Sequence, residues 1–152
     1  MKIFVTVGTT PFDSLIEFCD QELFSLFTLD LQIATGRYSP INCNWFRFDN
    51  DINKWYEMSD LVVTHGGAGT ILKLLRSNKD FIVVPNTDRL DDHQLDFCHF
   101  ISDRKFAPVS FDYTASLLNL IMSYYDFEKS VYDEPTFFLH EELEKTIRDA
   151  LR

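Results

Sequence analysis

Apolar residues occur along the chain in two patterns, short continuous runs and longer stretches with helical spacing. The continuous runs predict strands buried on both faces of a sheet, at residues 2–7, 29–34, 45–48, 60–64 and 81–84, with a shorter one at 106–109. The helical spacing predicts helices at residues 15–27, 51–58, 71–75, 91–102, 115–124 and 138–151. Strands and helices therefore alternate, which favours right-handed βαβ units and a Rossmann-like α/β fold with an open parallel sheet.

Composition and charge narrow the range of partners. The chain has 152 residues, which fits a single domain spanning residues 1–152. Its 24 acidic and 14 basic residues give a net charge of −10, which disfavours binding to nucleic acid or to an anionic membrane. Cys19, Cys43 and Cys98 form no CxxC pair, which argues against disulfides and structural zinc and indicates a cytoplasmic protein. Because no apolar stretch is long enough to span a membrane, we expect membrane association only through a partner.

A glycine-rich loop, HGGAGT at residues 65–70, lies between a predicted strand and a predicted helix. Ligands bind at the carboxyl ends of strands in such sheets. Small residues let the backbone approach a phosphate, and the helix N-terminus supplies N–H groups and a favourable dipole. The alternative is a plain tight turn, which needs fewer glycines. The spacing matches neither the dinucleotide-binding pattern GxGxxG nor a P-loop.

Two further loops follow predicted strands. The turn Gly8-Thr9-Thr10 offers two hydroxyls and either is an ordinary turn or holds a diphosphate from the other side. The loop at 85–94 ends in Asp92, His93 and Gln94, whose side chains suit hydrogen bonds to sugar hydroxyls, although Asp92 also suits helix capping. A metal site formed by His65, Asp92 and His93 matches no zinc spacing, so we expect no metal and no other cofactor.

Four segments of the chain resemble, in order, the glycosyltransferase family 28 C-terminal domain. They are MKIFVTVGTTPFDSLI, DLVVTHGGAGTIL, IVVPN and DDHQLDF, all within residues 1–110. Within that family the segments look like the small donor-binding subunits of two-part UDP-N-acetylglucosamine transferases. They are also similar to related bacterial subunits of exopolysaccharide and capsule assembly.

The resemblance implies one half of a GT-B enzyme, namely the nucleotide-sugar-binding Rossmann domain without its acceptor-binding half. In two-part members of the family the other half is a separate membrane-anchored chain, and the general base usually belongs to it. The candidate donor-binding residues are then Gly8, Thr9, Thr10, His65, Gly66, Gly67, Ala68, Gly69, Thr70, Lys73, Asn86, Asp92, His93 and Gln94.

Lys73 departs from the family pattern. The family usually has Glu three residues after Thr70, placed to accept hydrogen bonds from the ribose hydroxyls. Lysine accepts no hydrogen bond, so Lys73 either pairs with the diphosphate or points to solvent. Asn78 and Asp80 also replace a usual Gly and Pro, which affects the turn before the fifth strand.

Two hypotheses about function follow. In the first, the chain binds a UDP-sugar and, with a membrane-anchored subunit, transfers a hexose or N-acetylhexosamine to a lipid-linked acceptor with inversion. No residue of this chain stands out as the general base, so we expect the chain alone to be inactive. In the second, the chain is a non-catalytic module that activates or stabilises a transferase after losing tight donor binding. A self-sufficient homodimer is a third option.

The expected C-terminal helices, within residues 113–152, carry no family motif. The last of them has an apolar stripe on one face, formed by Phe138, Leu139, Leu143, Ile147 and Leu151. The chain also has 15 phenylalanines, an excess that suits an interface as well as a core. The stripe either docks onto a membrane-anchored partner or packs against the domain's own sheet.

Overall fold

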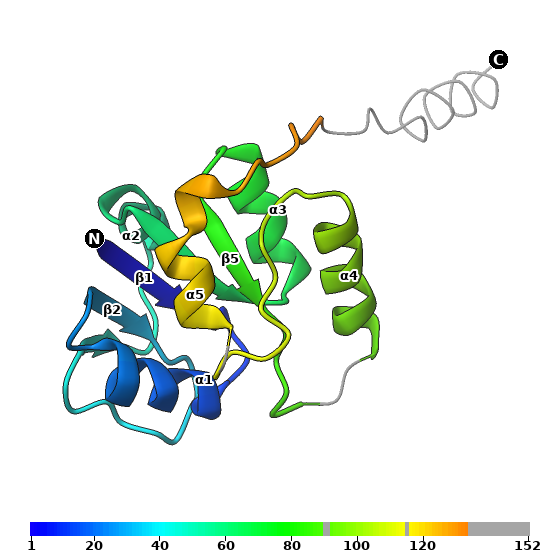
Figure 1. The fold of residues 1–152 in the computed structure, drawn as a ribbon. Coiled ribbons are helices and arrows are strands. Elements are labelled where there is room, and N and C mark those ends of the chain that lie inside the picture. The colour runs from blue at the N-terminus through cyan, green and yellow to red at the C-terminus, as the bar shows by residue number, and fades with distance from the viewer. Residues whose placement is uncertain (90–91, 115, 134–152) are drawn as a thin grey trace, which may run out of the picture.

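A parallel sheet of five strands, ordered β3-β2-β1-β4-β5, lies at the centre of the computed structural model (Figure 1). The structure describes residues 1–89, 92–114 and 116–133. For Asp92 and His93 it describes the backbone but not the side chains. The strands are β1 (Lys2–Thr6), β2 (Thr28–Gln32), β3 (Asn44–Phe46), β4 (Leu61–His65) and β5 (Phe81–Val84). This order and the parallel pairing confirm the Rossmann-like α/β fold predicted from the sequence.

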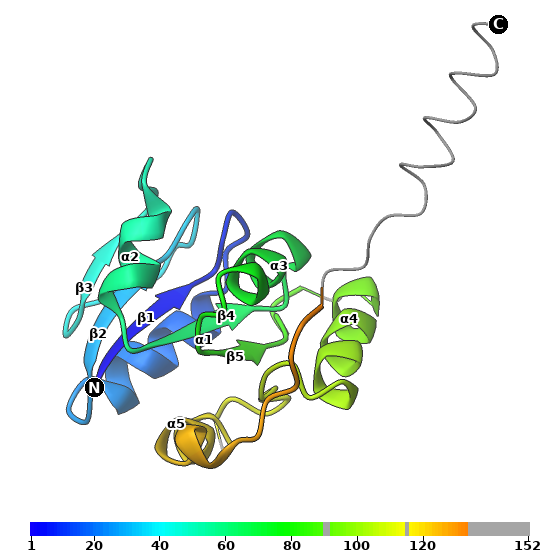
Figure 2. The same ribbon diagram turned by 90° about the horizontal axis from the view of Figure 1, so that it is seen from above.

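Helices cover both faces of the sheet, as Figure 2 shows. They are α1 (Asp13–Phe18) with the π-helical turn η1 (Cys19–Leu23), α2 (Ile52–Met58), α3 (Ala68–Arg76), α4 (Asp92–Asp103), α5 (Leu117–Met122) and the 3-10 turn η2 (Tyr124–Asp126). One hydrophobic cluster packs one face of the sheet against α1, η1 and α5. A second packs the opposite face against α2, α3 and α4.

The central strand β1 shows why both faces of the sheet are apolar. Ile3 and Val5 point into the first cluster and Phe4 into the second, and all three side chains are buried. Phe4 stacks on Phe46 at 6.0 Å and on Trp55 at 5.8 Å between ring centroids. Continuous apolar runs in the sequence therefore correspond to strands covered on both sides.

The structure corrects three boundaries predicted from the apolar pattern. The stretch 15–27 is not one helix, because α1 passes into η1 and the helical segment ends at Leu23. Residues 106–109 form no strand, only a single bridge between Val109 and Val83. The stretch 115–124 is shorter as a helix, since α5 covers Leu117–Met122 and a 3-10 turn follows it. The predicted helix at 138–151 and its apolar stripe lie outside the described residues.

A buried carboxylate in η1 holds a loop that lies later in the chain. Asp20 is fully buried and accepts hydrogen bonds from the Tyr38 hydroxyl (2.9 Å) and from the backbone N–H groups of Ile41 (3.0 Å), Asn42 (2.9 Å) and Cys43 (3.0 Å). Burial raises the pKa of Asp20, but these bonds outweigh that contribution and lower the pKa below its ordinary value. Asp20 thereby holds the loop between β2 and β3 in place.

None of the described helices combines the length and the apolar composition needed to cross a membrane.

Candidate functional site

The candidate site lies where the carboxyl ends of β1 and β4 meet. From β1 the chain adds β2 and β3 on one side, and β4 and β5 on the other, so the progression of the sheet reverses between β1 and β4. Ligands of open α/β sheets bind at such a switch point. The turn beginning at Gly8 and the glycine loop after His65 both leave the sheet here, as the sequence predicted.

His65 is the last residue of β4, and its imidazole lies between the two glycine turns. The side chain is only 6% exposed. A Cβ on Gly8 would lie 2.6 Å from Cε1 of His65, and a Cβ on Gly67 would collide with Nε2. Gly8 also has a φ of +61°, which L side chains rarely adopt. Gly8 and Gly67 are therefore glycines because they contact this ring.

The imidazole is neutral at pH 7. Burial lowers the pKa of His65 below its ordinary value of 6.5, against a smaller opposing effect of the Thr6 backbone. Its buried Nδ1 has no hydrogen-bond partner among the described residues. His65 thus brings a polar ring, without a charge, between the turns that follow β1 and β4.

The other two loop glycines differ from each other. A Cβ on Gly66 would lie 2.6 Å from Sγ of Cys98 and 2.7 Å from Cγ of Gln94, so Gly66 is required for the packing of α4. Gly69 is exposed, and a Cβ there would meet nothing within 4 Å. Gly69 is therefore the one glycine of this loop whose small size the fold itself does not require.

The first turn of α3 offers backbone donors at the same edge. The helix begins at Ala68, with Gly67 in the N-cap position and no side-chain capping bond there. Ala68 is exposed and Thr70 is partly exposed. The amide groups at this helix start and the positive end of its dipole suit a negatively charged ligand.

Among the residues of the first turn, Thr9 is exposed and Thr10 is partly exposed. The Thr10 N–H donates to the Val7 carbonyl at 3.2 Å, which closes the turn.

Asn86, two residues after the end of β5, links three segments of the chain. Its Nδ2 donates to the Pro11 carbonyl (3.0 Å), its Oδ1 accepts from the Asp88 N–H (3.1 Å), and its own N–H donates to Oε1 of Gln94 (3.1 Å). The side chain is 5% exposed. Asn86 thus orders the loop and fixes the position of the Gln94 side-chain oxygen. Asp92 begins α4, but the side chains of Asp92 and His93 lie outside the described residues.

Asp88 is a residue that the sequence analysis missed. Its carboxylate accepts from the Ser14 N–H at 3.1 Å and from the Ser14 hydroxyl at 2.5 Å, although 74 positions separate the two residues. The contact caps the start of α1 from another loop, because Phe12 in the N-cap position makes no side-chain capping bond. No local sequence signal identifies such a long-range cap.

Lys73 lies in the second turn of α3, on the side of the helix that faces α2. Its Nζ is 5.5 Å from the ring centroid of Tyr56, a cation–π distance, and the side chain is exposed. The structure therefore gives this ammonium group a partner within the protein.

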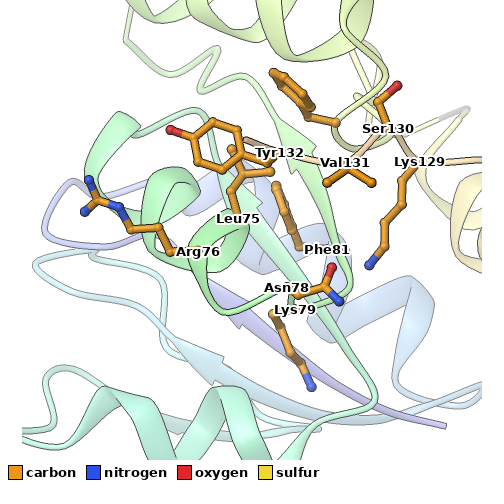
Figure 3. Close-up of a pocket in the computed structure, with 10 residues that line it drawn as sticks. Leu75, Arg76, Asn78, Lys79, Phe81, Lys129, Ser130, Val131 and Tyr132 are labelled. Carbon is orange, nitrogen blue, oxygen red and sulfur yellow. The ribbon is translucent and has the colours of Figure 1, made fainter. Parts of the chain in front are cut away.

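A cavity of about 390 Å³ lies far from these loops, beside the amino end of β5 (Figure 3). Its lining includes Arg76 at the end of α3, Phe81 at the start of β5, and Lys129 and Tyr132 from the last described segment. Lys129 pairs with Asp80 at 2.7 Å, and the Tyr132 ring packs edge-on against Phe106. The cavity marks where this segment crosses the domain, at the edge of the sheet opposite to the candidate site.

Within the described part of the chain, no group of three or more His, Cys, Asp or Glu side chains is placed to hold a metal ion.

The chain is similar in sequence to known proteins. The sequence profile described as the glycosyltransferase family 28 C-terminal domain matches residues 2–130. UDP-N-acetylglucosamine transferase subunit ALG13 of Homo sapiens is 34% identical over 108 residues, which cover 62% of this chain. The same match covers only 10% of the human protein, so this chain spans about a tenth of that relative.

Two solved structures share the fold. MurG from Acinetobacter baumannii superimposes with a TM-score of 0.62 at 21% identity, covering 82% of this chain and 41% of that one. The solution structure of ALG13 gives a TM-score of 0.60 at 22% identity, covering 87% of this chain and 89% of that one. The expected architecture, a Rossmann-like half of a GT-B glycosyltransferase, is thereby confirmed.

Proposed function

The chain belongs to the glycosyltransferase family 28 C-terminal domain family, and from this premise we propose that it binds the UDP-sugar donor of a glycosyl transfer reaction. The observation that carries the proposal is the meeting of the Gly8 turn and the HGGAGT loop around His65, at the switch point of the sheet. The uncapped first turn of α3 then receives the diphosphate.

The reaction we propose is a displacement at the anomeric carbon with inversion. An acceptor oxygen forms a new bond to that carbon while the bond to the UDP oxygen breaks, and the electron pair leaves with UDP. Negative charge therefore grows on the diphosphate, where the N–H groups and dipole of α3 stabilise it. The acceptor hydroxyl gives its proton to a base supplied by a partner subunit.

We place the sugar beside Gln94. Its Oε1 accepts from the Asn86 N–H, which orients the side chain, and we propose that its Nε2 donates to a sugar hydroxyl. The resemblance adds Asp92 and His93 to this group. Lys73 brings no acceptor to the ribose, and its ammonium group contacts Tyr56.

The partner is proposed from the relatives. ALG13 is named as a subunit of a UDP-N-acetylglucosamine transferase, which supports a second chain and a UDP-sugar such as UDP-N-acetylglucosamine. We propose that this second chain is membrane-anchored and binds a lipid-linked acceptor, in glycan or exopolysaccharide assembly, and that it holds this cytoplasmic chain at the membrane. The stripe that begins at Phe138 is the segment we expect to dock.

Calorimetric titration of the purified chain with UDP and UDP-N-acetylglucosamine tests the proposal. Saturable binding of both is expected, and Gln94→Ala should weaken binding of the UDP-sugar much more than binding of UDP. Absence of binding to the lone chain and to its complex with the partner would favour the alternative, a non-catalytic stabilising module. Transfer of sugar by the chain alone would refute the expectation that it is inactive without a partner.

A further inference from the structure

A closed ring of three hydrogen bonds supports the turn at Gly8. The Thr6 hydroxyl donates to Oε1 of Gln32, Nε2 of Gln32 donates to the Gly8 carbonyl (3.0 Å), and the Gly8 N–H donates to Oγ1 of Thr6 (3.2 Å). Thr6 and Gln32 are the last residues of β1 and β2 and pair in the sheet register. They are 1% and 6% exposed, and the bond between them is buried, while the two bonds to Gly8 are partly buried.

The ring continues physically into the glycine loop. Gly8 contacts the edge of the His65 imidazole, and the same imidazole contacts Gly67, the N-cap residue of α3. A movement of the Gly8 carbonyl away from Gln32 therefore shifts the surface on which His65 rests. Because interiors are close-packed, such a shift reaches the start of α3 rather than being absorbed in a void.

We propose that Gln32 is a positioning residue for the donor site, acting through Gly8 and His65 to set the separation of the two turns that hold the diphosphate. The inference rests on the proposed function for its ligand. Gln32 suits this role because its amide both accepts from Thr6 and donates to Gly8. A carboxylate accepts only, and an aliphatic side chain does neither.

The chemistry supplies a test that loss of packing alone does not mimic. In Gln32→Glu an ionised side chain cannot donate to the Gly8 carbonyl, whereas a protonated one can, and burial favours the protonated form. The UDP affinity of Gln32→Glu, taken relative to that of the wild type at the same pH, should be about ten-fold lower near pH 8 and should recover near pH 5.5. Gln32→Leu should bind UDP weakly at both pH values.

Other titrating groups are common to all the proteins compared. Tyr56 from α2 and His65 from β4 are the titratable side chains packed against Thr6 and Gly8, Lys73 contacts Tyr56, and Asp30 precedes Gln32 on β2 in contact with Lys2. UDP itself also titrates. Each is present in the wild type, in Gln32→Glu and in Gln32→Leu, so the ratios at a given pH isolate residue 32.

Amide NMR spectra of the unliganded proteins separate this inference from the proposed function. Gln32→Leu should move the Gly8 and Gly67 resonances while α5 stays unchanged, whether or not UDP binds. If the wild type binds UDP and both Gln32 variants bind it equally well, the positioning role is wrong. If the wild type does not bind UDP, the proposed function fails. Independently of UDP, an unmoved Gly67 resonance in Gln32→Leu would refute the coupling between Gln32 and the start of α3. Should the Gln32 variants not fold, Thr6→Val is expected to weaken binding and Thr6→Ser to retain it, and equal affinity of the two would refute the role.

Discussion

Replacing Gly69 by Ala separates a requirement of the fold from a requirement of the ligand. Gly69 is the second residue of α3, is exposed, and would place a Cβ in open space. Alanine stabilises a helix by about 0.5–1 kcal/mol relative to glycine, and nothing in the structure opposes that gain here. In a domain of this size such a change raises the melting temperature by roughly 1–4 °C.

The same methyl group should weaken UDP binding. If the diphosphate lies on the first turn of α3, a Cβ at Gly69 stands in its path and lengthens the contacts to the N–H groups. The loss of one such charge-assisted hydrogen bond corresponds to about 1.5–3 kcal/mol, or roughly a 10- to 150-fold increase in Kd. Thermal melting and calorimetric titration with UDP measure the two effects on one sample.

Asp103→Ala is the matched control. Asp103 is the exposed last residue of α4, where a negative charge opposes the helix dipole. The variant should also gain a few degrees of melting temperature, and UDP binding should not change, because the end of α4 lies at the other edge of the sheet. A Gly69→Ala protein that is more stable and binds UDP with unchanged affinity would refute the placement of the diphosphate.

Three other substitutions test separate parts of the argument. Gly67→Val should cost roughly 1–3 kcal/mol in urea unfolding because its side chain collides with His65, and the cost should shrink in a His65→Ala background. Lys73→Glu should tighten UDP binding several-fold by giving the ribose an acceptor, although it removes the contact with Tyr56, and unchanged affinity would remove position 73 from the site. Asp20→Asn should destabilise the protein by about 2–3 kcal/mol at pH 7, since one amide oxygen cannot accept four bonds. The folded pKa of Asp20 is lowered, so its stabilising effect is present above the ordinary Asp value of 3.8 and is lost as pH falls through the folded pKa. The gap between wild type and Asp20→Asn should therefore close in acid.

The sequence predicted the sheet well because four of its strands, β1, β2, β4 and β5, are almost wholly buried, whereas the edge strand β3 is largely exposed. Runs such as residues 2–7 are predominantly apolar at successive positions, a pattern typical of buried strands. The segment 15–27 was harder, since its apolar spacing continues through residues that do not form regular helix. Asp20 in this segment is buried, and its partners lie in a loop some 20 positions later, as with Tyr38 and Ile41. A local pattern contains no information on such a contact.

The convergence of the candidate loops could be predicted from the sequence, but the contacts between distant segments could not. Short motifs bring Gly8, His65 and the glycine loop to one edge, because parallel strands end on the same side. Gln32 and Asp88 carry no motif, because their contacts join segments far apart in the sequence: Gln32 at the end of β2 bonds to Gly8, and Asp88 bonds to Ser14. Asn86 was expected among the donor-binding residues, and its place as donor contact stays a prediction, since the structure uses its side chain to join two loops.

The four loop and turn glycines show why a motif alone does not identify a ligand contact. A glycine-rich loop is usually explained by the close approach of a phosphate, yet Gly8 and Gly67 are already required by the imidazole of His65, and Gly66 by Cys98 and Gln94. These three positions would be glycine even if nothing bound there. Only Gly69 has no such internal reason, and a glycine in the first turn of a helix costs stability. The unexplained cost at Gly69 is therefore the part of the motif that points to a ligand, and a substitution at that position tests the site more directly than one at any other glycine of the loop.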